Sequence, residues 1–84
     1  TSVCRELVLL KVETAPEERD QLLSIVNIFR AKVIDVAEDS LIIELTGNQA
    51  KVDAFLRLIQ GFTVREMART GLTGLERGGV SPIN

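Results

Sequence analysis

The stretch Glu6-Leu7-Val8-Leu9-Leu10-Lys11-Val12 decides the fold, because its apolar residues occupy both faces of an extended chain. Successive side chains of a strand point to opposite faces, so Val8, Leu10 and Val12 share one face while Leu7 and Leu9 share the other. A strand that is apolar on both faces is typical of the interior of a sheet. We therefore predict a buried strand near residues 5–13.

The residues that follow predict a helix near residues 15–30. Thr14 is a suitable N-cap, Pro16 suits the first turn and Glu17 completes a capping box. Apolar residues then recur at the spacing of one helix face, at Leu22, Ile25, Val26 and Phe29.

A β-hairpin is predicted after this helix. Its strands lie near residues 32–38 and 41–46, and the polar residues Glu38-Asp39-Ser40 form the turn. In the first of these strands, strict alternation places Ile34 and Val36 on one face and Val33 and Asp35 on the other.

The second half of the chain repeats the order of the first. Asn48 caps a predicted helix over residues 48–60, Gly61 suits a left-handed C-terminal cap, and residues 63–69 predict a fourth strand. The glycines after Thr70 indicate irregular structure, so we assign one domain to residues 1–78 and an irregular tail to residues 79–84. The order β-α-β-β-α-β favours an α+β, ferredoxin-like fold: a four-stranded antiparallel sheet with two helices on one face.

Two helices cover only one face of such a sheet. Because residues 6–12 are apolar on both faces and Ile42 is apolar as well, some apolar surface would then remain uncovered in a monomer, and a contiguous apolar patch usually marks an interface. We expect the domain to self-associate or to dock on a partner.

The composition excludes several classes of function. Ten basic against twelve acidic residues give a net charge of −2, which argues against binding to nucleic acids or to anionic membranes. Histidine is absent, so the commonest general base and transition-metal ligand is missing. A single cysteine excludes an intrachain disulfide, and no apolar run approaches the roughly 20 residues that span a bilayer.

Three groups of residues are candidate sites, each with a simpler explanation. Cys4 has no histidine to activate it and suits packing as a small apolar residue. Asp35, Glu38 and Asp39 could bind a divalent cation, but turn formation explains them as well. The basic residues near the last strand could grip a carboxylate or phosphate, or could simply be exposed and paired with nearby acids; they are Arg65, Arg69 and Arg77. We assign no catalytic, cofactor-binding or metal-binding residue and predict that the chain is not an enzyme.

Several motifs carry a family resemblance. Phe29-Arg30-Ala31-Lys32-Val33-Ile34-Asp35-Val36 is followed by Leu-Thr-Gly at 45–47, Lys-Val-Asp-Ala-Phe-Leu at 51–56 and Arg-Glu-Met-Ala-Arg-Thr-Gly at 65–71. In this order they resemble the C-terminal domain of the small, regulatory subunit of acetohydroxyacid synthase (acetolactate synthase). The resemblance extends from about Cys4 to Gly78, and its most specific parts are the first motif and the Arg-Thr-Gly that ends the last.

The resemblance implies a non-catalytic regulatory domain. Members of this family bind a catalytic subunit of branched-chain amino-acid biosynthesis, raise its activity and make it sensitive to feedback inhibition. Thiamine diphosphate, FAD and Mg are expected on that catalytic subunit and no cofactor in this chain. The effector site is expected in an N-terminal ACT domain, whereas the C-terminal domain supports dimerisation and helps to transmit the inhibitory signal.

The implied partners are the catalytic subunit and further copies of this chain, in a homodimer or a higher homo-oligomer. The implied location is the cytoplasm of a bacterium, or a plastid or mitochondrion of a eukaryote. Residues chosen as candidate contacts with these partners are Leu7, Leu9, Phe29, Arg30, Arg65, Arg69 and Arg77. The alternative is a stand-alone ferredoxin-like sensor that binds an amino acid or a nucleotide between subunits.

Overall fold

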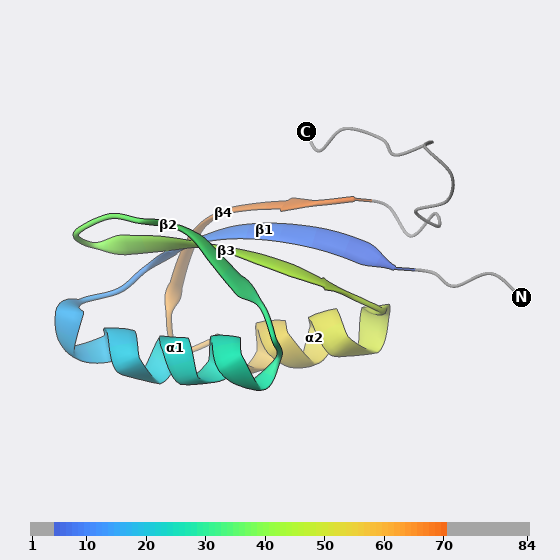
Figure 1. The fold of residues 1–84 in the computed structure, drawn as a ribbon, viewed down its shortest axis with the longest axis horizontal. Coiled ribbons are helices and arrows are strands. Elements are labelled where there is room, and N and C mark those ends of the chain that lie inside the picture. Colours follow the sequence, from blue (N-terminus) through green and yellow to red (C-terminus); the bar gives the residue numbers. More distant parts are fainter. Residues whose placement is uncertain (1–4, 71–84) are drawn as a thin grey trace, which may run out of the picture.

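The computed structural model describes residues 5–70 and has the predicted β-α-β-β-α-β order. Its elements are β1 (Glu6–Glu13), a 3-10 turn η1 (Pro16–Glu18), α1 (Arg19–Ile28), β2 (Lys32–Val36), β3 (Ser40–Gly47), α2 (Gln49–Leu58) and β4 (Thr63–Arg69). The four strands form one sheet in the order β2-β3-β1-β4, and every neighbouring pair is antiparallel. Both helices lie against the same face of the sheet (Figure 1). The predicted ferredoxin-like fold is confirmed.

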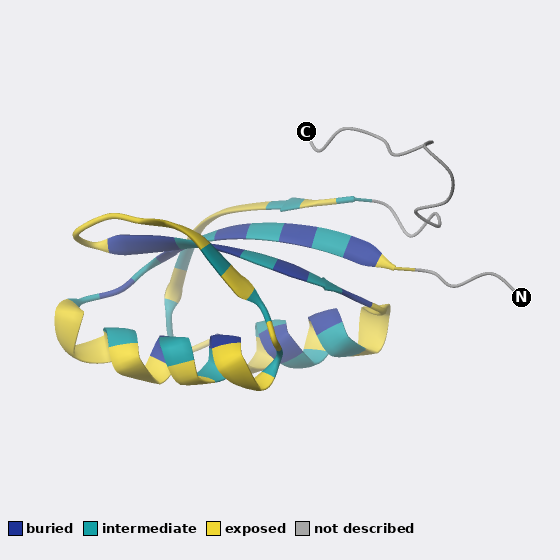
Figure 2. Ribbon diagram, in the orientation of Figure 1, coloured by how far each residue is buried: buried dark blue, intermediate teal, exposed yellow. Residues whose placement is uncertain are grey.

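The hydrophobic core fills the space between the sheet and the two helices. β1 contributes Val8, Leu10 and Val12, which are fully buried, while Leu7 and Leu9 on the other face are only half-buried. Figure 2 shows this alternation of buried and intermediate residues along β1. Burial of one such aliphatic side chain contributes about 1.5–3 kcal/mol. The other core residues are Leu22, Val26, Leu41, Ile43, Leu45, Val52, Phe55 and Ile59.

The first helical segment begins one residue later than predicted. Ala15, not Thr14, is the residue before the first turn, and its backbone N–H donates to the carboxylate of Glu18, not of Glu17. Thr14 is buried, and its N–H donates to the carbonyl oxygen of Asp39 at 2.9 Å. Its N–H is therefore not free for the Glu17 carboxylate, and its hydroxyl donates to the carbonyl oxygen of Ala15 at 3.0 Å, so Thr14 does not act as the cap.

Each edge strand of the sheet contains a β-bulge, which strict alternation did not predict. In β2, Val33 pairs with Ile43 and Asp35 pairs with Ile42, so Ile34 is the extra residue. Val33 therefore lies on the core side and Asp35 on the opposite side, and the predicted pairing of Val33 with Asp35 on one face is wrong. In β4 the extra residue is Arg65. Bulges at sheet edges increase the local twist and hinder further strand pairing.

The start of α2 agrees with the prediction, whereas the C-terminal ends of the helices do not. The N-cap of α2 is Asn48, as predicted, and its side chain accepts a hydrogen bond from the N–H of Lys51 at 2.8 Å. Gly61, however, does not adopt the left-handed conformation. Arg30 does, with a φ of 56° just beyond α1.

Arg30 belongs to a Schellman motif that ends α1. The N–H of Ala31 donates to the carbonyl oxygen of Val26 at 2.9 Å, and the N–H of Arg30 donates to that of Asn27 at 3.1 Å. This motif usually places glycine at the left-handed position. A side chain there costs about 1–2 kcal/mol, because its Cβ crowds the backbone.

Candidate functional site

The side of the sheet opposite the helices forms a surface that we call the open face. Directly opposed residues of antiparallel strands project from the same side, so the register defines its members. Leu9 of β1 faces Glu44 of β3 and Ala68 of β4, and Lys11 faces Ile42 and Glu66. Leu7, opposite Thr46, continues the face towards the start of β1. The structure thus places the interface candidates Leu7 and Leu9 on the uncovered side.

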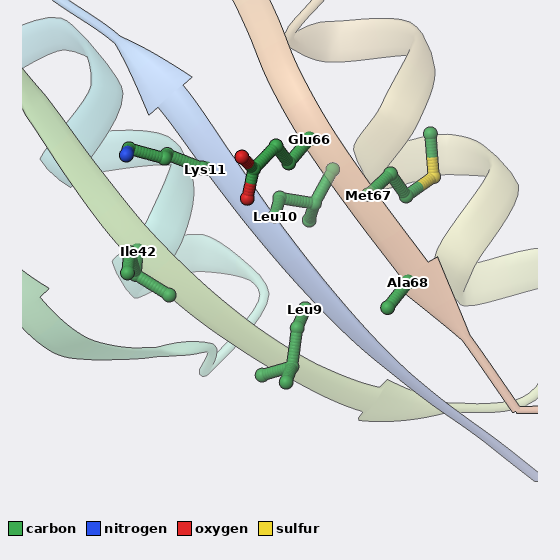
Figure 3. A pocket seen from close by; sticks show the side chains of 7 residues that line it. All are labelled: Leu9, Leu10, Lys11, Ile42, Glu66, Met67 and Ala68. Atoms are coloured by element: carbon green, nitrogen blue, oxygen red, sulfur yellow. The ribbon is translucent and has the colours of Figure 1, made fainter. Parts of the chain in front are cut away.

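A hollow of about 340 Å³ lies on the open face. Leu9, Ile42 and Ala68 give it an apolar lining, and Lys11 and Glu66 bring one charge of each sign (Figure 3). Leu10 and Met67 complete the lining. Sequence reasoning considered only arginines as anchors for a carboxylate and missed Lys11, whose place beside Glu66 follows from the register.

Arg65 is held by acidic residues of the same domain. Its Nη2 lies 3.1 Å from Oε2 of Glu13 and 3.6 Å from Oδ2 of Asp39. The hydrogen bond with Glu13 and the charge of that carboxylate raise the pKa of Arg65 above its usual value. The bulge directs Arg65 towards these acids on β1 and on the turn after β2, and the simpler explanation, an exposed arginine with acidic neighbours, accounts for it.

Arg69 is the partner of a buried carboxylate. Its Nε and Nη2 lie 2.8 Å and 2.7 Å from Oε1 of Glu6, a side chain that is only 2% exposed. Beside this pair, Thr70 exchanges hydrogen bonds with the backbone of Leu7 at 2.9–3.0 Å. The Arg-Thr of the last sequence motif therefore fastens the end of β4 to the start of β1.

Phe29 and Arg30 have different surroundings. The Phe29 ring meets that of Phe55 edge to face, with centroids 5.4 Å apart and planes at 81°, so it packs against the core. Arg30 is exposed. Of these two candidate contacts, Arg30 is exposed and Phe29 is partly buried.

The remaining candidate sites carry no assembled chemistry in the part that the structure describes. Cys4, Arg77 and the tail at 79–84 lie outside the described residues. Within residues 5–70, no three His, Cys, Asp or Glu side chains converge as a metal site would require, and Asp39 instead approaches Arg65. No helix among the described residues is long and apolar enough to cross a membrane.

The fold defines an α+β domain of the ferredoxin-like class. Residues 5–78 match the family model described as the small subunit of acetolactate synthase. The chain is 46% identical over 78 residues to the probable acetolactate synthase small subunit of Archaeoglobus fulgidus, which covers 93% of this chain and 49% of that protein. It is 42% identical over 76 residues to the small subunit of Bacillus subtilis, covering 90% of this chain and 44% of that protein.

A solved structure gives the same result. The crystal structure of the acetolactate synthase small subunit from Thermotoga maritima superposes with a TM-score of 0.79 at 42% identity, over 93% of this chain and 48% of that one. The chain belongs to the family of acetolactate synthase small subunits. It spans about half the length of the curated relatives that it matches.

Proposed function

We propose that this chain is a regulatory domain that dimerises through the open face and couples the small subunit to the acetolactate synthase catalytic subunit. The observation that carries the proposal is the apolar hollow on an uncovered sheet face, in a chain of this family. Exposure of Leu9, Ile42 and Ala68 to water is unfavourable, and contact with a second copy of the domain would bury these side chains.

The chemistry itself is proposed to stay with the catalytic subunit. Thiamine diphosphate, FAD and Mg would be bound there, and this domain would raise the activity and transmit feedback inhibition by a branched-chain amino acid. In support, the arginines of β4 are engaged by acidic residues of the same domain: Arg65 by Glu13 and Asp39, and Arg69 by Glu6.

Reconstitution with the catalytic subunit tests the proposal. The catalytic subunit would be mixed with the small subunit at the full length its host encodes, with this chain alone, and with the small subunit lacking it. We expect only the full-length subunit both to raise the activity and to confer feedback inhibition. Equal activation and feedback by the subunit that lacks this chain would contradict the proposal.

One observation favours the alternative, a small-molecule sensor. The hollow brings Lys11 and Glu66 together with aliphatic side chains, which are the groups that could hold the carboxylate, ammonium and side chain of an amino acid. The hollow is, however, a depression on a sheet face that we assign to a second copy.

A calorimetric titration distinguishes the two functions. We expect no saturable binding when valine is added to this chain at up to about 1 mM, a concentration at which a site of about −4 kcal/mol would be half filled. Leucine, isoleucine and ATP serve as parallel titrants. Stoichiometric binding of valine that disappears in Lys11→Ala would move the effector site into this domain.

A further inference from the structure

Arg30 occupies a backbone position that favours glycine. Its φ of 56° makes it the one non-glycine residue within residues 5–70 with a left-handed backbone, and it ends α1 in the Schellman motif described above. An arginine at this position carries a conformational cost, and strained residues of this kind cluster at functional sites such as ligand clamps and switch regions. The backbone therefore points to a role for the Arg30 side chain that glycine could not supply.

The described part of the domain makes no use of the Arg30 guanidinium. The residue is exposed, and the arginine side chains that form hydrogen bonds or ion pairs within residues 5–70 are those of Arg19, Arg65 and Arg69, not that of Arg30. A cation beyond the C-terminus of α1 does interact favourably with the helix dipole. That attraction is weak at an exposed position, and the N–H groups of Arg30 and Ala31 already satisfy two carbonyl groups of the last turn. The dipole does not explain why glycine is absent.

Arg30 lies two residues after an exposed apolar side chain at the end of α1. We call Ile28 and Arg30 the α1–β2 corner, since they lie at the end of α1 and in its connection to β2. Ile28 is 71% exposed, the highest value among the exposed large hydrophobic residues of residues 5–70. The sequence contains no acidic residue between Asp20 and Asp35. Lys32 opposes Glu44 and therefore projects from the open face, so Arg30 gives the corner its positive charge, on a chain with a net charge of −2.

We propose that the α1–β2 corner is a contact surface for the catalytic subunit and that Arg30 anchors it on a carboxylate. The guanidinium group binds carboxylates through two parallel hydrogen bonds, which gives arginine a reason to be retained where a smaller residue would fit the backbone better. Ile28 beside it provides the apolar contact that surrounds such anchors in protein interfaces. This inference rests on the proposed function.

A second copy of this chain is a poorer occupant of the corner. A two-fold dimer packs the same patch of each protomer against itself, so an interface centred here would bring Arg30 towards Arg30 of the other copy. Such an approach of like charges is unfavourable, whereas the open face offers both signs of charge through Lys11 and Glu66.

The test separates backbone strain from binding. Arg30→Gly, in the small subunit at its full length, should raise Tm by about 2–4 °C, because glycine adopts the left-handed conformation without strain. The same variant should weaken the Kd for the catalytic subunit about tenfold or more, measured by biolayer interferometry, because the loss of a charge-assisted anchor costs at least that much. Arg30→Asn, which tolerates a left-handed backbone and keeps a Cβ, should weaken binding equally without lowering Tm.

A matched control removes the same charge at the end of the other helix. Arg57 is exposed in the last turn of α2, and Arg57→Gln should leave the Kd unchanged. Wild-type affinity in both Arg30 variants would overturn the inference, and so would a lower Tm for Arg30→Gly. Oligomer dissociation by the Arg30 variants in sedimentation would assign the corner to a second copy instead. A wild-type subunit that does not bind the catalytic subunit at all would refute the proposed function itself.

Discussion

Leu9→Glu is expected to convert the proposed dimer of this domain into a folded monomer. Leu9 lies in the hollow of the open face, opposite Ala68 and Glu44, so the new carboxylate reaches solvent in a monomer. In a dimer closed through this face the same carboxylate would be desolvated close to Glu44, while the nearby Lys11 already faces Glu66, and this costs several kcal/mol. Sedimentation velocity at micromolar concentration measures the change in mass, and circular dichroism shows whether the fold is retained.

The matched substitutions use the other faces of the domain. Val12→Glu places the charge three residues along the same strand but inside the core, where Val12 is fully buried. It should lower the free energy of unfolding by about 4 kcal/mol or more. Leu58→Glu changes an apolar residue that is 52% exposed on α2 and should leave a folded dimer. The dimer proposal fails if the wild-type domain sediments as a monomer at high micromolar concentration.

The periodicity of apolar residues was sufficient to predict the fold. The two-sided apolar pattern of residues 6–12 placed β1 in the sheet interior, the recurrence of Leu22, Val26, Val52 and Phe55 predicted the two helices, and the order β-α-β-β-α-β placed both on one face. These signals are strong because a shift of one residue would expose a whole row of core side chains.

The details that sequence reasoning missed depend on contacts between distant segments. The bulge at Ile34 exists because Val33 and Val36, three residues apart, must face Ile43 and Leu41, which are two apart. Likewise, the N–H of Thr14 is used by Asp39, which lies on the β2–β3 turn, and this moved the start of the first helical turn. No local pattern contains either requirement.

The candidate site was only partly predictable for the same reason. Alternation alone separated Leu7 and Leu9 from Val8, Leu10 and Val12, but which face the helices cover and the convergence of Lys11 with Glu66 depend on how the elements pack and how β1 and β4 pair. The motif around Arg69 was recognisable in the sequence, yet its physical role needed Glu6, 63 residues away along the chain.

Arg69→Met is expected to destabilise the domain strongly. The substitution keeps the aliphatic part of the side chain but removes both nitrogen atoms from Oε1 of Glu6, and this carboxylate then stays buried without a cation. Breaking a buried ion pair by removing one partner costs about 3–5 kcal/mol, and we reduce this to about 2–3 kcal/mol because Arg69 itself is 36% exposed. For a domain of this size, Tm should fall by roughly 10–20 °C in a thermal melt.

Two further variants show whether the buried charge is the cause. Glu6→Gln combined with Arg69→Met removes both charges, so no carboxylate is left unpaired, and most of the lost Tm should return. Arg69→Lys keeps the charge but cannot place two nitrogen atoms on Glu6, and its Tm should lie between those of the wild type and Arg69→Met. If Arg69→Met melts within about 2 °C of the wild type, the pair contributes little to folding. Arg69 would then be free to serve a partner, and its motif would need a functional explanation, because the fastening of β4 to β1 would no longer account for it.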